Sequence, residues 1–539
     1  MNQFVINNLS VASGAGHSTF YVYDGSAYKT VTSMALIAEE KTNIISFDWD
    51  NVISWLSARK EAMPKYIIDI EQIAKQLYGQ KKARQDLLPW SVWNILRAFY
   101  NEDTEKDDFK KTQKLYQGLA DADEPERQRL FYRMLSAMYT CYEQQLKELN
   151  AKGEYDRFYH VERPIRVINL ERTYKGITIN TGSVSNWVSQ LSHEVYKLRN
   201  RLQLEFDIVS PTDVKTVLSK IEDKALIREA RELIEEKGYY FFLKDSKLRH
   251  PLIELLYQEK KSTTDLNALL SIGALNPTQQ KIYPVYDSFG TITARTKVVT
   301  PNLQNLTRKF RSIVSADKKK ELLYIDYAQF EAGILADDSK DVALINAYNT
   351  SYIYDSIGEK IQVEKYITDK VEQLKFCKSL FYKYSYGMDI SNNIGILKDF
   401  KLEAHAPTLS KLIVDAFSSF TTLDAYRTAI KEKALTENKI GTRDGNYRYR
   451  LENEKNVSWA MSQRIQGTAS LIIKRAIIKL RSIDNEIEFL IPMHDAALFQ
   501  VPKETAKEKE DTIQRIFEEE FLKECPSLKV SAKFKNFCD

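Results

Sequence analysis

The chain has 539 residues, of which 43% are hydrophobic and 28% charged, and its formal net charge is +4. This length and composition predict a soluble protein of two to four domains with buried cores. The net charge is too small for the overall field of the chain to indicate a polyanionic partner. The four cysteines are scattered without a Cys-x-x-Cys pair, which disfavours a zinc site or disulfide framework and predicts a reducing compartment.

The opening residues, MNQFVINNLS, lack the basic start and apolar core of a signal peptide. No run of about 18 apolar residues occurs in the chain, so a membrane-spanning helix is not expected. We therefore predict a cytoplasmic protein that does not bind membranes.

Residues 1–150 begin with two strand-like segments, Thr19 to Tyr23 and Thr42 to Phe47, and then become helical. Farther along, the charged and amphipathic stretch Lys220 to Lys237 predicts a helix. Gly176 follows a helical run, which we expect it to end as a C-cap. The N-terminal half is thus predicted to contain a mixed domain followed by helices.

Two stretches are far more basic than the rest of the chain. Residues 291–320 contain eight lysines and arginines against one acid, Asp317. Residues 457–481 contain no acid and five cations, namely Arg464, Lys474, Arg475, Lys479 and Arg481. Such runs most often form solvated faces. Because both flank the acidic centre described next, we expect them to lead a phosphate backbone toward it.

An acid stands where a strand gives way to a helix. The apolar run Leu322 to Ile325 predicts a buried strand and is followed by Asp326, after which Phe330, Ile334 and Leu335 recur at helical spacing. Open α/β sheets place their chemistry at such an edge. A lone aspartate at a strand-helix junction is most often only a helix N-cap, so this acid alone does not identify a site.

A second acid lies at a predicted hairpin. The apolar runs Ile487 to Met493 and Ala496 to Val501 are separated by His494 and Asp495, which predicts two strands with an acid at the tip. Two carboxylates at the ends of buried strands suit a pair of Mg²⁺ ions about 4 Å apart, as in-line phosphoryl transfer requires.

Residues 369–388, DKVEQLKFCKSLFYKYSYGM, predict a basic and aromatic helix that ends at Gly387. Lys378, Tyr382 and Tyr386 are spaced four residues apart and share one face. A cation followed by two rings suits a triphosphate and then a sugar and base. Aromatic residues at this spacing most often form a core stripe, but the lysine at its head argues against burial.

In this order, these segments resemble the motifs of family A DNA polymerases. Residues 326–331, DYAQFE, are similar to the first palm motif, the Lys378 helix to the second motif, and Met493-His494-Asp495 to the third. Residues 291–306, TITARTKVVTPNLQNL, resemble the Thr-Gly-Arg stretch and the Pro-Asn-Leu-Gln-Asn run of the family. Residues 464–469 resemble its Gln-Gly-Thr-Ala helix.

The resemblance implies an α/β (α+β) fold, a right-hand polymerase with palm, fingers and thumb, preceded by a degenerate ribonuclease H-like exonuclease domain. The expected domains are the exonuclease-like domain at 1–150, the thumb at 151–265, the first part of the palm at 266–340, the fingers at 341–456 and the second part of the palm at 457–539.

Proofreading is expected to be absent. A working exonuclease of this type opens with an Asp-x-Glu strand, whereas Thr19 to Asp24 offers a single acid. Asp48 and Asp50 have the spacing but follow the second strand-like segment. In the alternative interpretation Asp48, Asp69 and Glu143 are surface acids.

The implied reaction is template-directed addition of deoxynucleotides to a primer 3′ end during DNA replication, with primed DNA and deoxynucleoside triphosphates as partners and two Mg²⁺ ions as cofactors. The implied catalytic residues are Asp326, Asp495 and Lys378, and the metal-binding residues are Asp326, Tyr327 and Asp495. The nucleotide-binding residues are Gln329, Glu331, Lys378, Tyr382 and Tyr386. The DNA-binding residues are Arg295, Gln304, Asn305, Gln466 and His494. In this scheme Lys378 is also the general acid, and Glu331 excludes a 2′-hydroxyl.

The sequence departs from the family pattern at several positions. Ala294 and Lys383 stand where the family has Gly, Tyr382 stands in a Phe position, Leu374 replaces an expected basic residue, and Ser462 and Ala496 replace a common Asn and Glu. Ala496 leaves two acids in the core of the site, for which we expect reduced activity at worst. Some phage members of the family also have tyrosine at the position that Tyr382 occupies here.

Two other functions stay open. A single-subunit RNA polymerase shares the palm chemistry, although Glu331 favours deoxynucleotides. A catalytically impaired nucleic-acid-binding subunit is the alternative from another class. A phage-type replicative enzyme, located in the cytoplasm of a bacterial host, is the subtype that we expect, whereas the sequence does not identify replisome or processivity partners.

Overall fold

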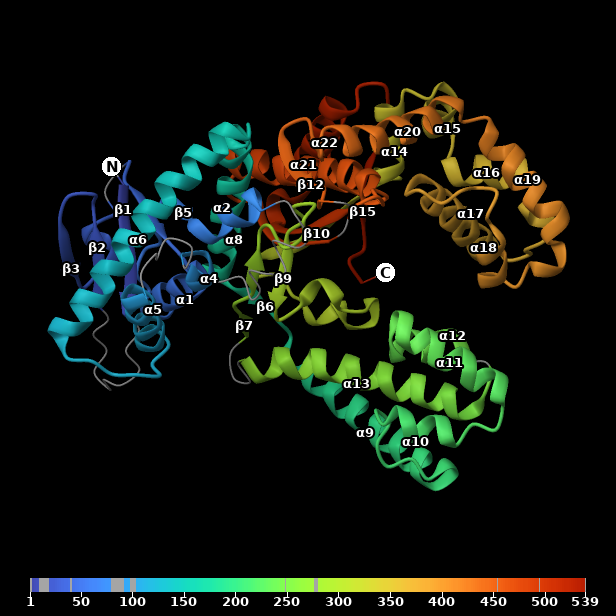
Figure 1. Cartoon of the computed structure of the whole chain (residues 1–539), viewed down its shortest axis with the longest axis horizontal. Helices are drawn as coiled ribbons and strands as arrows, with labels where there is room; N and C mark the ends of the chain where they lie inside the picture. The colour runs from blue at the N-terminus through green and yellow to red at the C-terminus, as the bar shows by residue number, and fades with distance from the viewer. Residues whose placement is uncertain are drawn as a thin grey trace. The chain divides into compact units, whose positions relative to one another are not determined.

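The structure is a computed structural model that describes residues 2–8, 19–38, 41–78, 92–96, 103–247, 249–275, 280–452, 454–493 and 495–538 (Figure 1). The chain forms two compact units. The large unit comprises Met1–Lys175, Val285–Lys297 and Leu323–Lys535, and the small unit comprises Gly176–Pro284, Val298–Leu322 and Asn536–Asp539. Among the described helices, none is both long and apolar enough to cross a membrane.

The large unit begins with a five-stranded sheet of order β3-β2-β1-β4-β5. Its strands are β1 (Asn2–Asn8), β2 (Thr19–Tyr23), β3 (Tyr28–Val31), β4 (Asn43–Ser46) and β5 (Ile67–Asp69). Strand β1 pairs antiparallel with β2 and parallel with β4. This mixed sheet agrees with the expected ribonuclease H-like fold. The opening strand is β1, however, and the strand predicted first in the chain is the second.

Both faces of this sheet are covered by helices. Phe4 and Ile6 of β1 pack with α2 (Ile70–Leu77) and α6 (Glu124–Ala151), whereas Val5 packs with α1 (Trp49–Arg59). Successive side chains of a strand point to opposite faces, so apolar residues in a row produce a sheet that is buried on both sides. Helix α5 (Asp103–Tyr116) and the short helix α4 (Val92–Leu96) complete this part.

Two acids of this domain are bound by one cation of the chain itself. Strand β1 contains neither Asp nor Glu. Asp69 at the end of β5 is buried, which corrects its interpretation as a surface acid. Arg166 of α8 (Arg163–Lys175) donates to Asp69 at 2.9 Å and to Asp50 at 2.8 Å. The guanidinium group of Arg166 thus binds two acids of this domain.

A four-stranded sheet of order β13-β14-β10-β15 forms the centre of the large unit. Its strands are β10 (Lys320–Tyr327), β13 (Glu488–Pro492), β14 (Ala496–Pro502) and β15 (Ala532–Lys535). Helix α14 (Phe330–Ser339) follows β10, which confirms the predicted strand-to-helix change. The predicted hairpin on either side of Asp495 is β13 and β14, which pair antiparallel.

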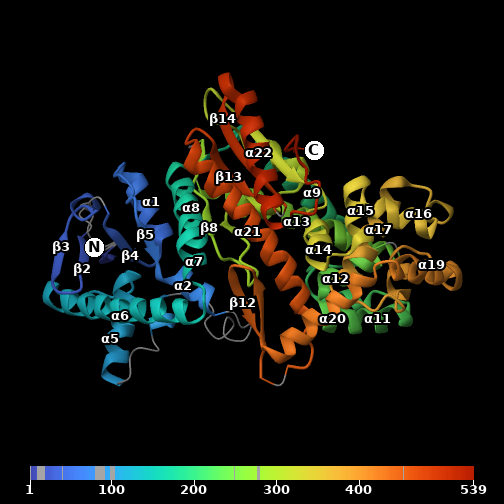
Figure 2. The same ribbon diagram turned by 90° about the horizontal axis from the view of Figure 1, so that it is seen from above.

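Helices surround this sheet. The Tyr327 ring stacks on Phe330 at 4.3 Å and meets Phe517 of α22 (Ala506–Glu524) at 5.2 Å. Helix α21 (Trp459–Ile483) packs against α22, α14 and α8 (Figure 2). A tight turn joins β11 (Lys439–Thr442) to β12 (Gly445–Tyr449).

The remaining helices of the large unit lie between α14 and β11. They are α15 (Val342–Thr350), α16 (Ile353–Ile361), α17 (Lys370–Ser385), α18 (Ile394–Asp399), α19 (Ala406–Ser418) and α20 (Thr421–Thr436). Asp369 caps α17 by accepting the Glu372 N–H at 2.8 Å, and Gly387 follows the helix with a φ of 114°. Both ends of the predicted 369–388 helix are thereby confirmed to within three residues.

The small unit is mainly helical. Its helices are α9 (Thr181–Phe206), α10 (Val214–Ser219), α11 (Lys224–Lys237), α12 (Tyr239–Ser246) and α13 (Pro251–Leu275), and its short strands β6 (Ile177–Thr178) and β7 (Lys281–Ile282) pair with each other. Helix α11 confirms the helix expected at 220–237. Gly176 has a φ of 70°, and a Cβ there would lie 2.9 Å from the Ile282 carbonyl oxygen, so glycine is required. The predicted domain boundaries stay predictions.

The cations of the basic run 457–481 are paired within the protein, and the role of this run toward a phosphate backbone stays a prediction. Each of its five cations is paired with a carboxylate of the chain. Arg464 pairs with Asp338 at 2.6 Å, and Arg481 pairs with Glu171 at 2.9 Å. The net charge of a segment in the sequence does not show where its partners lie, and here the acids come from distant segments.

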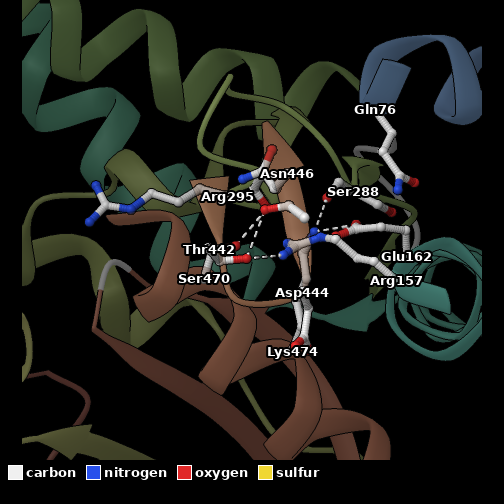
Figure 3. A network of polar contacts seen from close by, with 12 residues as sticks. Gln76, Arg157, Glu162, Ser288, Arg295, Thr442, Asp444, Asn446, Ser470 and Lys474 are labelled. Carbon is white, nitrogen blue, oxygen red and sulfur yellow. Dashed lines mark hydrogen bonds and ion pairs between the residues drawn. The ribbon is translucent and has the colours of Figure 1, made fainter. Parts of the chain in front are cut away.

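Lys474 is the most deeply buried of these cations and belongs to a polar network (Figure 3). Its ammonium group donates to Glu162 at 2.6 Å and to the Ser288 carbonyl oxygen at 2.9 Å. Arg157 donates to Glu162 at 3.0 Å and to the Thr442 hydroxyl at 3.0 Å. The network therefore ties the segment after α6 to α21 and to the β11–β12 hairpin.

Replacing Lys474 by Met should leave the Glu162 carboxylate buried with one cation fewer. Breaking such a buried pair costs about 3–5 kcal/mol of unfolding free energy. The matched control is Lys479→Met in the same helix, whose pair with Glu519 is half exposed and should contribute less than about 1 kcal/mol. Urea unfolding followed by circular dichroism measures both, and equal small losses would contradict the expected importance of the buried pair.

Candidate active site

The central sheet brings the two predicted acids to neighbouring positions. Strand β14 lies beside β10. The backbone N–H of Tyr327 donates to the Asp495 carbonyl oxygen at 3.1 Å, and Met493 N–H donates to the Ala496 carbonyl oxygen at 2.9 Å across the turn. Asp326, directly before Tyr327, is thereby held beside Asp495. His494, which was predicted to contact DNA, lies outside the described residues.

Asp326 does not cap the helix that follows it, so the N-cap interpretation is wrong. The N-cap of α14 is Gln329, whose φ is 50° and whose side chain makes no capping hydrogen bond. Instead, a carboxylate oxygen of Asp326 accepts a hydrogen bond from the Lys535 ammonium group of β15. Asp326 is therefore available at the sheet edge and is balanced by a cation.

Asp495 lies among several charged groups. Its pKa is raised from 3.8 to about 6, first by burial and then by the nearby carboxylates of Glu331 and Asp326. Arg295 and Lys378 act in the opposite direction. Five charged residues from four separate motif segments thus lie near one another, and each of the five was predicted to belong to the site.

Glu331 is fixed by two donors. The guanidinium group of Arg295 and the hydroxyl of Tyr386 both donate to its carboxylate. The pKa of Tyr386 is raised by burial and then by the Glu331 charge, and Gln466 also bonds to this tyrosine. The Tyr382 and Tyr386 rings are stacked, with centroids 6.2 Å apart and an interplanar angle of 10°. Each of these residues was predicted to belong to the site.

Helix α17 keeps its predicted ligand-binding stripe out of the core. Its buried residues are Phe376, Cys377, Leu380, Phe381, Tyr384 and Ser385. Lys378 is exposed, and Tyr382 and Tyr386 are only partly buried. The core-stripe interpretation is therefore wrong, because the core faces of α17 are formed by other residues.

Tyr354 of α16 is a site residue that the sequence reasoning missed. Its hydroxyl lies 2.9 Å from the Tyr382 hydroxyl, and the Lys378 ammonium group lies 5.3 Å from the centroid of its ring. Burial, then Tyr382, raises the pKa of Tyr354. Tyr354 lies outside the segments that resemble polymerase motifs, so only the tertiary fold shows its position.

Other predicted residues have local partners. The Gln329 side-chain oxygen accepts the Ile353 N–H at 2.6 Å and so anchors the start of α16. Lys375, beside Leu374, pairs with Glu372 at 2.6 Å. Gln304 and Asn305 belong to the small unit, where the Gln304 side-chain oxygen accepts the Val298 N–H at 2.8 Å. Their proposed contacts with nucleotide or DNA stay predictions.

Ala294, which stands where the family has Gly, occupies a backbone position that favours glycine. It is fully buried and has a φ of 59°, in the left-handed region. An L-residue there costs about 1–2 kcal/mol relative to glycine. The next residue is Arg295, whose N–H donates to the Thr291 hydroxyl at 3.0 Å. The family glycine therefore suits the backbone turn that presents this arginine.

The donor set of the site fits magnesium. Asp326 and Asp495 supply carboxylates, and the Tyr327 carbonyl is the third predicted ligand. Among the residues that the structure describes, no group of three or more His, Cys, Asp or Glu side chains is arranged to hold a metal. Mg²⁺ commonly binds through one or two carboxylates together with substrate phosphates, so a closed protein cage is not needed.

Comparison with known proteins identifies the family. The model of DNA polymerase family A matches residues 179–536. The chain belongs to DNA polymerase family A. It is 23% identical to "DNA polymerase I" of Helicobacter pylori over 67% of its length and 41% of that protein. It is 22% identical to "DNA polymerase I" of Caldicellulosiruptor bescii over 93% of its length and 59% of that protein. The chain thus spans about half the length of these family A relatives.

A solved structure gives the same fold. The structure is "POL domain of Pol1 from M. smegmatis complex with DNA primer-template and dNTP", and the match has a TM-score of 0.73 over 99% of this chain and 95% of that one, at 16% identity. The match confirms the predicted α/β right-hand polymerase fold of this family A member. At this identity the likeness concerns the fold alone.

The raised pKa of Asp495 makes stability depend on pH. Because the folded chain holds this proton up to about pH 6 while the unfolded value is 3.8, stability falls as pH rises between these values, and the full penalty is present above pH 6. Asp495→Asn removes the penalty and should be more stable than the parent by up to about 3 kcal/mol at pH 8, with the difference vanishing near pH 4. Thermal unfolding in EDTA tests this, and a difference independent of pH would contradict it.

Proposed function

We propose that this protein is a DNA-directed DNA polymerase that adds deoxynucleotides to a primer 3′ end during DNA replication. The observation that carries the proposal is the juxtaposition of Asp326 and Asp495 at the edge of the central sheet, with Lys378 and Glu331 facing them. The similar M. smegmatis polymerase domain was solved in complex with a DNA primer-template and a dNTP, which supports the same substrates here. Since the proposed template is DNA, we place the protein in the cytoplasm.

In this mechanism Asp326, Asp495 and the Tyr327 carbonyl would hold two Mg²⁺ ions. The ions, when bound, lower the pKa of the primer hydroxyl and neutralise charge on the leaving pyrophosphate. The exposed Lys378 ammonium group binds the triphosphate and donates a proton to the pyrophosphate as it leaves. The Tyr354 ring, 5.3 Å from this ammonium group, steadies it by a cation–π contact.

Glu331 provides the proposed discrimination against ribonucleotides. Arg295 and Tyr386 hold its carboxylate from two directions, so it does not need to rearrange when a nucleotide enters. A fixed carboxylate beneath the sugar fills the space of a 2′-hydroxyl. A carboxylate held in this way favours a DNA polymerase over a single-subunit RNA polymerase.

We further propose that the N-terminal domain has no proofreading activity. Arg166 binds both Asp50 and Asp69, and the Asp48 carboxylate accepts the Tyr116 hydroxyl at 2.9 Å. These acids are thus engaged within the protein. Single-stranded DNA incubated with Mg²⁺ should stay intact, and 3′ shortening that Asp50→Asn abolishes would contradict this.

Asp326→Asn and Asp495→Asn should each abolish primer extension. Losing one of two metal-binding carboxylates removes several kcal/mol of transition-state stabilisation, or about 1,000-fold in rate. Asp511→Asn, an exposed acid of α22, is the control and should extend normally. Extension on a primed template with Mg²⁺ measures all three. Full activity of either site variant would refute the proposal.

A catalytically impaired DNA-binding subunit is the second candidate, favoured by Ala496 in place of a third acid. Binding and primer-extension assays of the parent protein distinguish the two functions. Binding to primed DNA without any metal-dependent extension would support the second.

Replacing Glu331 by Ala should open space beneath the sugar. We expect the preference for deoxynucleotides over ribonucleotides to fall at least about 10-fold, as for other steric selections in enzyme pockets. Single-nucleotide incorporation with dGTP and GTP measures the ratio. An unchanged ratio would show that another residue selects the sugar, and a preference of the parent for GTP would favour the RNA polymerase alternative.

A further inference from the structure

Strand β15 places two lysines beside the proposed metal site. It pairs antiparallel with β10, with Tyr324 opposite Lys535 and Asp326 opposite Lys533. Residues opposite each other in such a pair share one face of the sheet, and diagonal neighbours lie within reach of long side chains. Both lysines therefore lie on the face that bears Asp326.

Lys535 is the lysine of this pair that donates a hydrogen bond to Asp326. Its ammonium group reaches diagonally across the ladder to one carboxylate oxygen. The side chain of Lys535 is 55% exposed and that of Asp326 is 22% exposed. Because more than half of the lysine side chain is exposed to solvent, its ammonium group can leave the carboxylate without opening the core.

The two other cations near the acids contact other groups. Arg295 is bound to Glu331, and Lys378 lies over the Tyr354 ring. The repulsion between Asp326 and Asp495 is therefore offset on the Asp326 side by Lys535. A divalent ion that binds this oxygen of Asp326 competes with the ammonium group for it.

We propose that Lys535 is a positioning residue, the built-in counter-ion of Asp326, and that metal binding displaces it. The proposal rests on the proposed polymerase function and adds a regulation of that same site. A lysine that competes for a ligand oxygen weakens metal binding and makes catalysis respond to metal at higher concentrations. While no metal is bound, the Lys535 ammonium group offsets part of the negative charge of the two acids.

Direct Mn²⁺ binding tests the proposal. The full chain is mixed with a dideoxy-terminated primer-template and the next dNTP, and free Mn²⁺ is followed by electron paramagnetic resonance. Lys535→Met should bind Mn²⁺ about 3- to 10-fold more tightly than the parent, because a competitor has gone, corresponding to about 0.7–1.4 kcal/mol. Lys535→Arg should resemble the parent.

Lys533→Met is the matched control, since it removes the same charge from the same face of β15. Its Mn²⁺ affinity should stay within about 2-fold of the parent, as expected for an exposed charge that is screened by solvent. An unchanged or weaker affinity in Lys535→Met would overturn the proposal. So would equal gains in both methionine variants, which would show a general effect of charge.

Asp326→Asn separates this proposal from the proposed function. If the parent loses Mn²⁺ binding with this substitution but Lys535→Met does not tighten binding, the metal site stands and the counter-ion role falls. If the parent shows no Mn²⁺ binding that depends on Asp326, the proposed function fails together with the inference. Circular dichroism of each variant confirms that the chain is folded.

Discussion

One backbone hydrogen bond, from Tyr327 N–H to the Asp495 carbonyl oxygen, is the constraint on which the site depends. It fixes the turn between β13 and β14 against the end of β10, so that two carboxylates from distant parts of the chain become neighbours. Two neighbouring carboxylates repel each other unless cations offset their charge, and burial, Glu331 and Asp326 together raise the pKa of Asp495. The central sheet holds the two carboxylates close together, and a bound metal ion would reduce the repulsion between them.

The chain uses its charges in two ways. In α21 and in the N-terminal domain, cations such as Lys474 and Arg166 are buried against specific acids and hold segments together. Around Asp495, cations and acids are partly exposed, and their contacts can exchange for ligands. This difference in burial separates structural ion pairs from a site that is ready to bind charged substrates, although both look alike in the sequence.

The sequence predicted what depends on local pattern. The strand before Asp326, the hairpin around Asp495 and the helix that carries Lys378 all follow from local sequence patterns, and the structure confirms them. It did not predict β1, whose asparagines obscure the strand pattern, or the contacts of Tyr354 and Lys535. Those contacts join segments that are far apart in the chain, and a lysine on an edge strand resembles an ordinary solvated residue.

The most direct test of the shared metal site is a structure of the chain with primer-template, incoming nucleotide and Mn²⁺, in which anomalous scattering locates the metal. We expect a manganese peak bound by carboxylate oxygens of both Asp326 and Asp495, at about 2.0–2.3 Å. Carboxylates more than about 8 Å apart, or metal bound elsewhere, would contradict the shared site, because no ion could then bridge the two acids.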